Sequence, residues 1–195
     1  MHTMQAYLKE TPIINFSHPK VKTLATELSK GCTTDEQIAK HCYVYVRDTI
    51  HHAGDYKDEI TTCIASDVLT HCSGWCYAKS HLFVALLRAN GIPAGFSYQR
   101  LSCSEYLPDI YCLHGLANVY LNDYGWYRVD VRGNKKGVDA QFTPPHEQLA
   151  FTLGENEFDL PEILADPLPE IVTALETYKG YSEFIQHFPD IEKQV

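Results

Sequence analysis

Apolar positions in the first fifty residues recur with the spacing of amphipathic helices. The first predicted helix begins after a Ser17 cap, ends at Gly31 and presents one apolar face, formed by Val21, Leu24, Ala25 and Leu28. Thr34 and Gln37 form a capping box for a second helix, with the apolar face Ile38, Ala39, Cys42 and Tyr45. Residues 51–73 are polar and predict an irregular segment with a single turn at 66–69.

The centre of the chain predicts a buried helix. Residues 82–87 are six consecutive apolar residues, and they begin six positions after Cys76. A helix that is apolar on every side is a buried helix. Gly91 and Pro93 are the residues that end it, so the helix is expected at about 76–90.

Strand patterns follow this helix. Residues 94–101, 115–121 and 126–131 are predicted strands, and Asn122-Asp123-Tyr124-Gly125 separates the last two as a turn. We therefore predict an α+β fold, with N-terminal helices and a central buried helix packed on an antiparallel sheet. The tail from 155 to 169 is expected to wrap the surface before a short helix near 170–178. We interpret 1–195 as a single domain with a core at about 60–131 and a C-terminal extension at 144–195.

Composition narrows the class of partner. The chain is 45% hydrophobic and 21% charged, which is typical of a packed globule rather than a disordered chain. Its net charge of −9 argues against nucleic acid or an anionic membrane as partner. Without a long apolar run or a basic leader before an apolar segment, we expect a soluble, cytoplasmic protein. The oligomeric state stays open.

One cysteine has the setting of a nucleophile. The seven cysteines are odd in number and lack the spacing of a disulfide scaffold, so most are expected to be reduced. Cys76 falls in the first turn of the predicted buried helix, where free backbone N–H groups and the helix dipole favour a thiolate. The backbone N–H of Cys76 is a candidate donor to the oxyanion that forms when a thiolate attacks a carbonyl.

His114 and Asp130 are the candidate partners of Cys76. His114 stands just before a predicted strand, and Asp130 lies on the other strand of the same hairpin. Pairing Leu121 with Trp126 would put the two side chains on opposite faces of the sheet. Pairing Leu121 with Gly125 would put them diagonally on one face, within side-chain reach. We therefore predict the second register, or another register or bulge of the same parity.

Zinc is the main chemical alternative. His71, Cys72 and Cys76 are close in sequence, and Cys103 and Cys112 would complete a set of ligands. The spacing is poor, because no Cys-x-x-Cys pair occurs, so we predict no metal and no other cofactor. His51-His52 with Asp55 and Asp58 is interpreted as a solvated loop, and Lys79 and Ser80 as structural residues, with the ammonium of Lys79 reaching solvent or a carboxylate.

Three blocks in this order resemble the transglutaminase-like superfamily. They are Gly74-Trp75-Cys76 with Lys79-Ser80-His81-Leu82 and 85–94, then His114 ahead of Val119-Tyr120-Leu121, then Gly125-Trp126 ahead of Val129-Asp130. The resemblance implies a papain-like fold and acyl transfer from an amide through a thioester. It also implies that Cys76 is the nucleophile, His114 the base and Asp130 the orienting acid. The sequence after the acid, Val131-Arg132-Gly133-Asn134-Lys135, departs from the Pro-Thr that is frequent in the family.

The expected function is a cysteine-dependent amide hydrolase or acyltransferase, such as a cysteine protease, acting on a peptide, a protein or a small amide. Candidate substrate-binding residues are Trp75, Tyr98, Arg132 and Asn134, and Tyr111 is a further candidate for the edge of the cleft. Two alternatives remain, a non-catalytic binding or scaffold domain on the same fold, and an enzyme resembling arylamine acetyltransferases.

Overall fold

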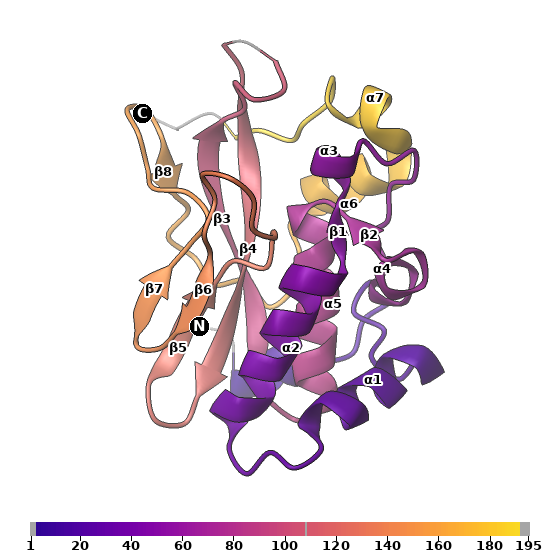
Figure 1. The fold of residues 1–195 in the computed structure, drawn as a ribbon, viewed down its shortest axis with the longest axis vertical. Helices are drawn as coiled ribbons and strands as arrows, with labels where there is room; N and C mark the ends of the chain where they lie inside the picture. Colours follow the sequence, from indigo (N-terminus) through magenta and orange to yellow (C-terminus); the bar gives the residue numbers. More distant parts are fainter. Residues whose placement is uncertain (1–2, 108, 192–195) are drawn as a thin grey trace.

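The computed structural model describes residues 3–107 and 109–191, which form a layer of helices packed on one face of a curled antiparallel sheet (Figure 1). A short 3₁₀ helix, η1 (Met4–Leu8), precedes the helical layer. This layer contains α1 (Pro19–Ser29), α2 (Asp35–Thr49), α4 (Ala65–His71) and α5 (Cys76–Ala89). Thr34 caps α2 through its hydroxyl as the sequence predicted, whereas α1 is capped by His18 and not by Ser17.

Helix α5 is the centre of the molecule. It packs against α1, α2 and α4 on one side and against the sheet on the other. Every residue from Cys76 to Arg88 is buried, which confirms the helix that the apolar run predicted. Gly91 follows its end with a positive φ of 72°, a conformation that glycine adopts without strain.

The main sheet has the strand order β5-β4-β3-β8. Its strands are β3 (Ala94–Ser102), β4 (Tyr111–Leu121), β5 (Gly125–Val129) and β8 (Phe158–Asp159). β4 begins four residues earlier than expected, because its first residues pair with the end of β3, as Tyr111 does with Ser102. His114 therefore lies within a strand and not ahead of one.

The β4–β5 register decides whether His114 and Asp130 share a face. Leu121 pairs with Gly125, and Ala117 pairs with Val129. One further step along this register sets Asp130 against Leu116, diagonal to His114. The predicted register is confirmed.

The segment 51–73 is more ordered than the sequence predicted. It contains α3 (Ala53–Tyr56), α4 and a two-residue parallel ladder between β1 (His51–His52) and β2 (Ser73–Gly74). The expectation of a single turn was wrong, because this ladder pairs residues twenty-two positions apart, which no local pattern reveals. The ladder fixes His52 beside the residues that lead into α5.

The C-terminal part adds two small strand pairings and two helices to this core. It adds a small hairpin, β6 (Gln141–Thr143) with β7 (His146–Gln148), whose turn holds a cis peptide bond between Pro144 and Pro145. Helix α6 (Pro169–Thr177) matches the predicted short helix, and α7 (Gly180–Phe184) follows it. Within the described residues, the helices are all too short or too polar to cross a lipid bilayer.

Lys79 is buried inside the helical layer. Its ammonium donates to the carbonyl oxygens of Arg47 (3.2 Å) and Ile50 (2.5 Å) at the end of α2. The expectation that it reaches solvent or a carboxylate was wrong, because the carbonyls at a helix C-terminus are acceptors with no partner in their own helix. Burial lowers the pKa of Lys79 to about 7. This contact joins the first turn of α5 to the C-terminal end of α2.

Candidate active site

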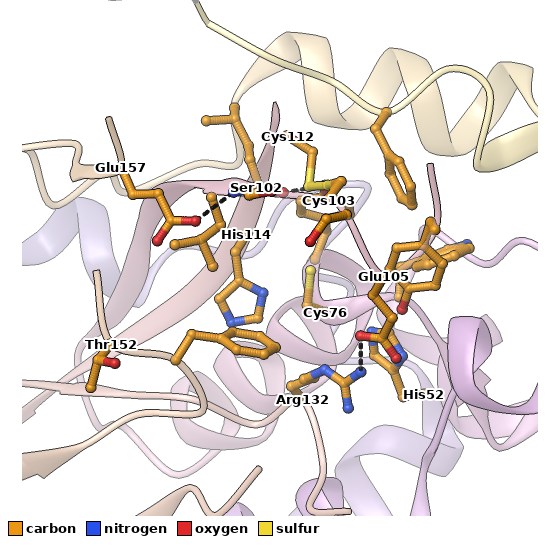
Figure 2. A pocket seen from close by; sticks show the side chains of 18 residues that line it. His52, Cys76, Ser102, Cys103, Glu105, Cys112, His114, Arg132, Thr152 and Glu157 are labelled. Carbon is orange, nitrogen blue, oxygen red and sulfur yellow. Dashed lines mark hydrogen bonds and ion pairs between the residues drawn. A yellow bond between two sulfur atoms is a disulfide. The ribbon is translucent and has the colours of Figure 1, made fainter. Parts of the chain in front are cut away.

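The N-terminus of α5 opens into a cavity of about 300 Å³ between the helical layer and the sheet (Figure 2). Cys76 and His114 both line it, and each is 6% exposed, so the cavity is the route to these two side chains. Asp130 lies behind His114 and is fully buried. The three residues that the sequence proposed as a catalytic set are thus brought together from α5, β4 and the end of β5.

Cys76 is the first residue of α5, and Trp75 is its N-cap in extended conformation. The first turn of a helix leaves its N–H groups without acceptors in the helix, so the sulfur lies at the positive end of the helix dipole. The Cys76 sulfur also accepts a hydrogen bond from the backbone N–H of Gly115 on β4, at 3.3 Å. The nucleophile candidate is therefore held between a helix terminus and the edge of a strand.

Gly115 permits this close approach of strand and helix. A Cβ atom at residue 115 would lie 2.8 Å from Cδ1 of Tyr77 and 3.0 Å from its Cα. The sequence analysis assigned Gly115 only to a strand. A glycine inside a strand pattern can mark such an approach of backbone to backbone, and that was the available signal.

We expect Gly115→Ala to lower the stability of the protein and the reactivity of Cys76 together. The new methyl group meets the backbone of Tyr77, which cannot rotate away, so α5 and β4 must separate. Overpacking of this kind costs about 1–3 kcal/mol, and the N–H to sulfur contact is lost. Urea unfolding and the alkylation rate of Cys76 measure the two effects. Gly154→Ala is the control, because its Cβ would meet only the side-chain carboxylate of Glu157, at 3.3 Å, and no backbone atom. An unchanged Gly115→Ala protein would contradict this account.

His114 is bound to Asp130 through one ring nitrogen. His114 Nε2 lies 2.7 Å from Asp130 Oδ2, which leaves Nδ1 as the nitrogen available to the sulfur. Figure 2 shows the His114 ring beside Cys76. Asp130 is itself fixed by two backbone donors, the N–H of Arg132 at 2.9 Å and the N–H of Ala150 at 3.1 Å. The side chain of Arg132 pairs with Asp55 instead, so the carboxylate of Asp130 is free to orient the imidazole.

The charges at this site favour an imidazolium. Burial alone would lower the pKa of His114, but the charges of Asp130 and Cys76, and hydrogen bonds to both, raise it to about 10. Burial alone would raise the pKa of Asp130, yet His114 and the two backbone donors hold it below its ordinary value. In this arrangement a histidine that carries a proton lies beside the sulfur of the candidate nucleophile.

Two of the four predicted substrate-binding residues are in the cavity wall. Among the described residues that line the cavity, Trp75 and Arg132 are present, whereas Tyr98 and Asn134 are not, nor is Tyr111. Tyr98 is buried, with its hydroxyl accepting from the backbone N–H of Leu168. Asn134 shapes its own loop by binding the backbone N–H and carbonyl of Ala140. Both side chains serve local packing and loop structure, which sequence position did not distinguish from a role in the cavity.

Arg132 lines the cavity without offering a free guanidinium. Its two terminal nitrogens each lie 2.8 Å from an oxygen of Asp55. A bidentate pair of this kind occupies the donors that a substrate carboxylate would need. Asp55 therefore occupies the part of Arg132 that would bind a carboxylate.

The sequence analysis missed His52. It was interpreted as part of a solvated loop, but it is 6% exposed and lines the cavity. Burial lowers its pKa well below the ordinary value, so the ring is neutral. Its place depends on the β1–β2 ladder, which the sequence pattern did not predict.

Cys103 and Cys112 form a disulfide in the wall of the cavity, whereas the other five cysteines are free. The prediction that most of the cysteines are reduced is confirmed, and this pair is the exception, because β3 and β4 align Leu101 with Cys112 and bring Cys103 next to it. Sulfurs joined to one another are not thiolate ligands, so the proposed zinc set loses two members. In the part of the chain that the structure describes, no group of three or more potential ligands is arranged to hold a metal ion.

The sequence model of the transglutaminase-like superfamily matches residues 22–131, which is more than half of the chain. The chain therefore belongs to this superfamily, as the three sequence blocks indicated. No curated protein matches the sequence.

Two solved structures are similar to this chain. A candidate cysteine protease from Cytophaga hutchinsonii is 19% identical over 66% of this chain, with a TM-score of 0.52. A candidate protease from Parabacteroides distasonis is 14% identical over 67% of this chain, with a TM-score of 0.43. The matched regions span 42% and 28% of the lengths of these two proteins. The first likeness supports the papain-like α+β fold.

Proposed function

We propose that this protein is a cysteine-dependent amide hydrolase or acyltransferase that forms a thioester on Cys76. The observation that carries the proposal is one cavity in which the Cys76 sulfur lies beside an imidazole bound to a buried carboxylate. The substrate class is an amide of a peptide, a protein or a small molecule. The candidate protease from Cytophaga hutchinsonii, which shares the fold, supports a peptide amide.

The reaction has two halves. In the first, the Cys76 thiolate attacks the carbonyl carbon, and the backbone N–H of Cys76 donates to the oxyanion. The imidazolium of His114 gives its proton to the nitrogen, the C–N bond breaks, and the amine leaves the acyl group on sulfur. Asp130 holds the ring in position throughout.

In the second half, water or an amine replaces the leaving amine. Neutral His114 removes a proton from the entering molecule, whose oxygen or nitrogen attacks the thioester carbon. The C–S bond breaks, releasing a carboxylic acid or a new amide, and the thiolate–imidazolium pair is restored. Hydrolysis and acyl transfer thus differ only in the molecule that enters.

Selective alkylation tests this proposal without knowledge of the substrate. At about pH 6 to 7, where ordinary thiols are mostly protonated, we expect iodoacetamide to modify Cys76 at least about ten-fold faster than Cys72. Cys72 is exposed and Cys76 is buried, so access alone predicts the opposite order. Mass spectrometry of the digested protein gives both rates.

His114→Ala is the matched control, since it removes the imidazolium and leaves the cysteine. We expect the rate at Cys76 to fall below that of Cys72 in this variant. Equal or slower labelling of Cys76 in the unmodified protein would favour the alternative, a binding domain without turnover.

A further inference from the structure

The segment after α7 runs from the helical layer to the sheet, and its Phe188 lines the cavity. We call residues 185–190 the C-terminal strap (Figure 1). The Pro189 carbonyl accepts from the backbone N–H of Leu113 at 2.8 Å. The carboxylate of Asp190 binds Nε and Nη2 of Arg100, both at 2.7 Å. The strap is therefore fastened to both β4 and β3.

The strap uses the same edge of β4 as the nucleophile. Residues two apart in a strand direct their N–H groups to the same edge, so Leu113 and Gly115 share one. Gly115 donates to the Cys76 sulfur and Leu113 donates to the strap. β5 pairs with β4 only from Ala117 onward, so this part of the edge would otherwise be open to an extended peptide.

Phe188 fixes the strap to the helical side of the cavity. Its ring lines the cavity and lies 5.3 Å, between ring centres, from both Trp75 and Tyr106. Trp75 is in turn stacked on Phe184 at 4.8 Å. The residue that precedes the nucleophile is thus packed against the strap and against the helix that precedes the strap.

The remaining wall is also cross-linked between elements. Asp55 on α3 pairs with Arg132 and Lys135, which follow β5, and Lys135 also pairs with Glu105 on the β3–β4 connection. The Cys103–Cys112 disulfide joins the two sides of that connection. Figure 2 shows this wall around Cys76, with Glu105 and Arg132 on one side and the disulfide on another. The cavity volume of about 300 Å³ is at the small end of the range for ligand sites.

We propose that the C-terminal strap determines substrate class by preventing an extended chain from passing along β4 through the site. The amide must then enter end-on, carried by the terminus of a chain, by a slim side chain or by a small molecule. This inference rests on the proposed function and specifies its substrate. Phe188 and the Arg100–Asp190 pair are the specificity-determining groups.

The test compares electrophiles on the same sulfur. The first reagent is a dipeptide with a chloroacetamide at its end. The second is a decapeptide with a chloroacetamide on one side chain. The third is a decapeptide with an electrophile in its backbone, so that peptide continues on both sides of the reacting carbon. In the unmodified protein we expect the first or the second to modify Cys76 at least ten-fold faster than the third. The faster of these two identifies the source of the amide as a terminus or a side chain.

Releasing the strap should admit the third reagent. We expect Phe188→Ala and the charge reversal Asp190→Lys each to raise the ratio of its rate on Cys76 to the iodoacetamide rate on Cys76 at least ten-fold. Asp48→Lys is the matched control, because Asp48 forms a similar two-point pair with Arg47 and lies outside this cavity. Phe188→Leu, which keeps an apolar side chain, serves if Phe188→Ala unfolds, and circular dichroism checks each variant.

Two results would overturn the inference. They are equal rates for the flanked and end-carried reagents in the unmodified protein, and strap variants that leave the ratio of these rates unchanged. Failure of the proposed function looks different, because Cys76 would then react no faster than Cys72 with iodoacetamide whatever the state of the strap.

Discussion

Cys76→Ala is expected to remove turnover of every amide substrate, by about 10⁵-fold or more, while the fold is retained. Loss of a nucleophile in this class of mechanism has effects of that size, because the remaining groups act only through it. Alanine is smaller than cysteine and is a good helix former, so the first turn of α5 has no steric reason to change. Activity against the amide panel and a urea unfolding curve are the measurements.

The same variant should change the titration of His114. The charge of Cys76 and its hydrogen bond contribute to raising the pKa of His114 to about 10, after Asp130 and against burial. Without the sulfur the imidazolium loses part of its stabilisation, so the pKa should fall in Cys76→Ala. NMR of the ring protons measures this change. An unaltered pKa would mean that sulfur and ring do not interact.

The pKa of His114 also predicts how turnover by the unmodified protein depends on pH. Below about pH 10 His114 carries the proton that the leaving amine needs, and above it this proton is lost. Turnover should therefore decline on the alkaline side near pH 10, well above the range of an ordinary histidine. A decline near pH 6 to 7 would show an unpaired histidine.

The placement of the candidate site residues was predictable because it depends on local pattern and on strand parity. The apolar run that follows Cys76 could only be a buried helix, and its first turn placed that residue at an N-terminus. The hairpin register determines whether His114 and Asp130 lie on the same face of the sheet. Of the two registers considered, only one placed them on the same face, and the structure has that register. Regular helix and strand geometry was therefore enough to infer from sequence spacing that these side chains lie close together.

The wall of the cavity was not predictable, because it is built from contacts between distant segments. His52 depends on a ladder with residues twenty-two positions later, and the strap reaches β4 from the far end of the chain. The Cys103–Cys112 disulfide depends on the β3–β4 pairing and has no sequence motif of its own. Disulfides are rare in cytosolic proteins, so this pair is at odds with the cytoplasmic location that the sequence suggested.

Asp130→Asn is expected to lower turnover by about 10³–10⁴-fold. The Asp130 carboxylate accepts three hydrogen bonds, from His114 and from the backbone N–H groups of Arg132 and Ala150. Both oxygens therefore face N–H donors, and an amide NH₂ group in either position sets donor against donor. The imidazole loses its charged partner, so its pKa should fall toward the ordinary range.

The same geometry predicts a cost in stability. A buried donor left without an acceptor costs about 1–3 kcal/mol, so the free energy of unfolding should decrease by a similar amount. Asp159→Asn is the control, because Asp159 is a partly exposed carboxylate that pairs with Arg128 outside the set formed by Cys76, His114 and Asp130. Turnover within ten-fold of the unmodified enzyme in a folded Asp130→Asn protein would mean that His114 is oriented by its surroundings, and Asp130 would then be a residue of the fold alone.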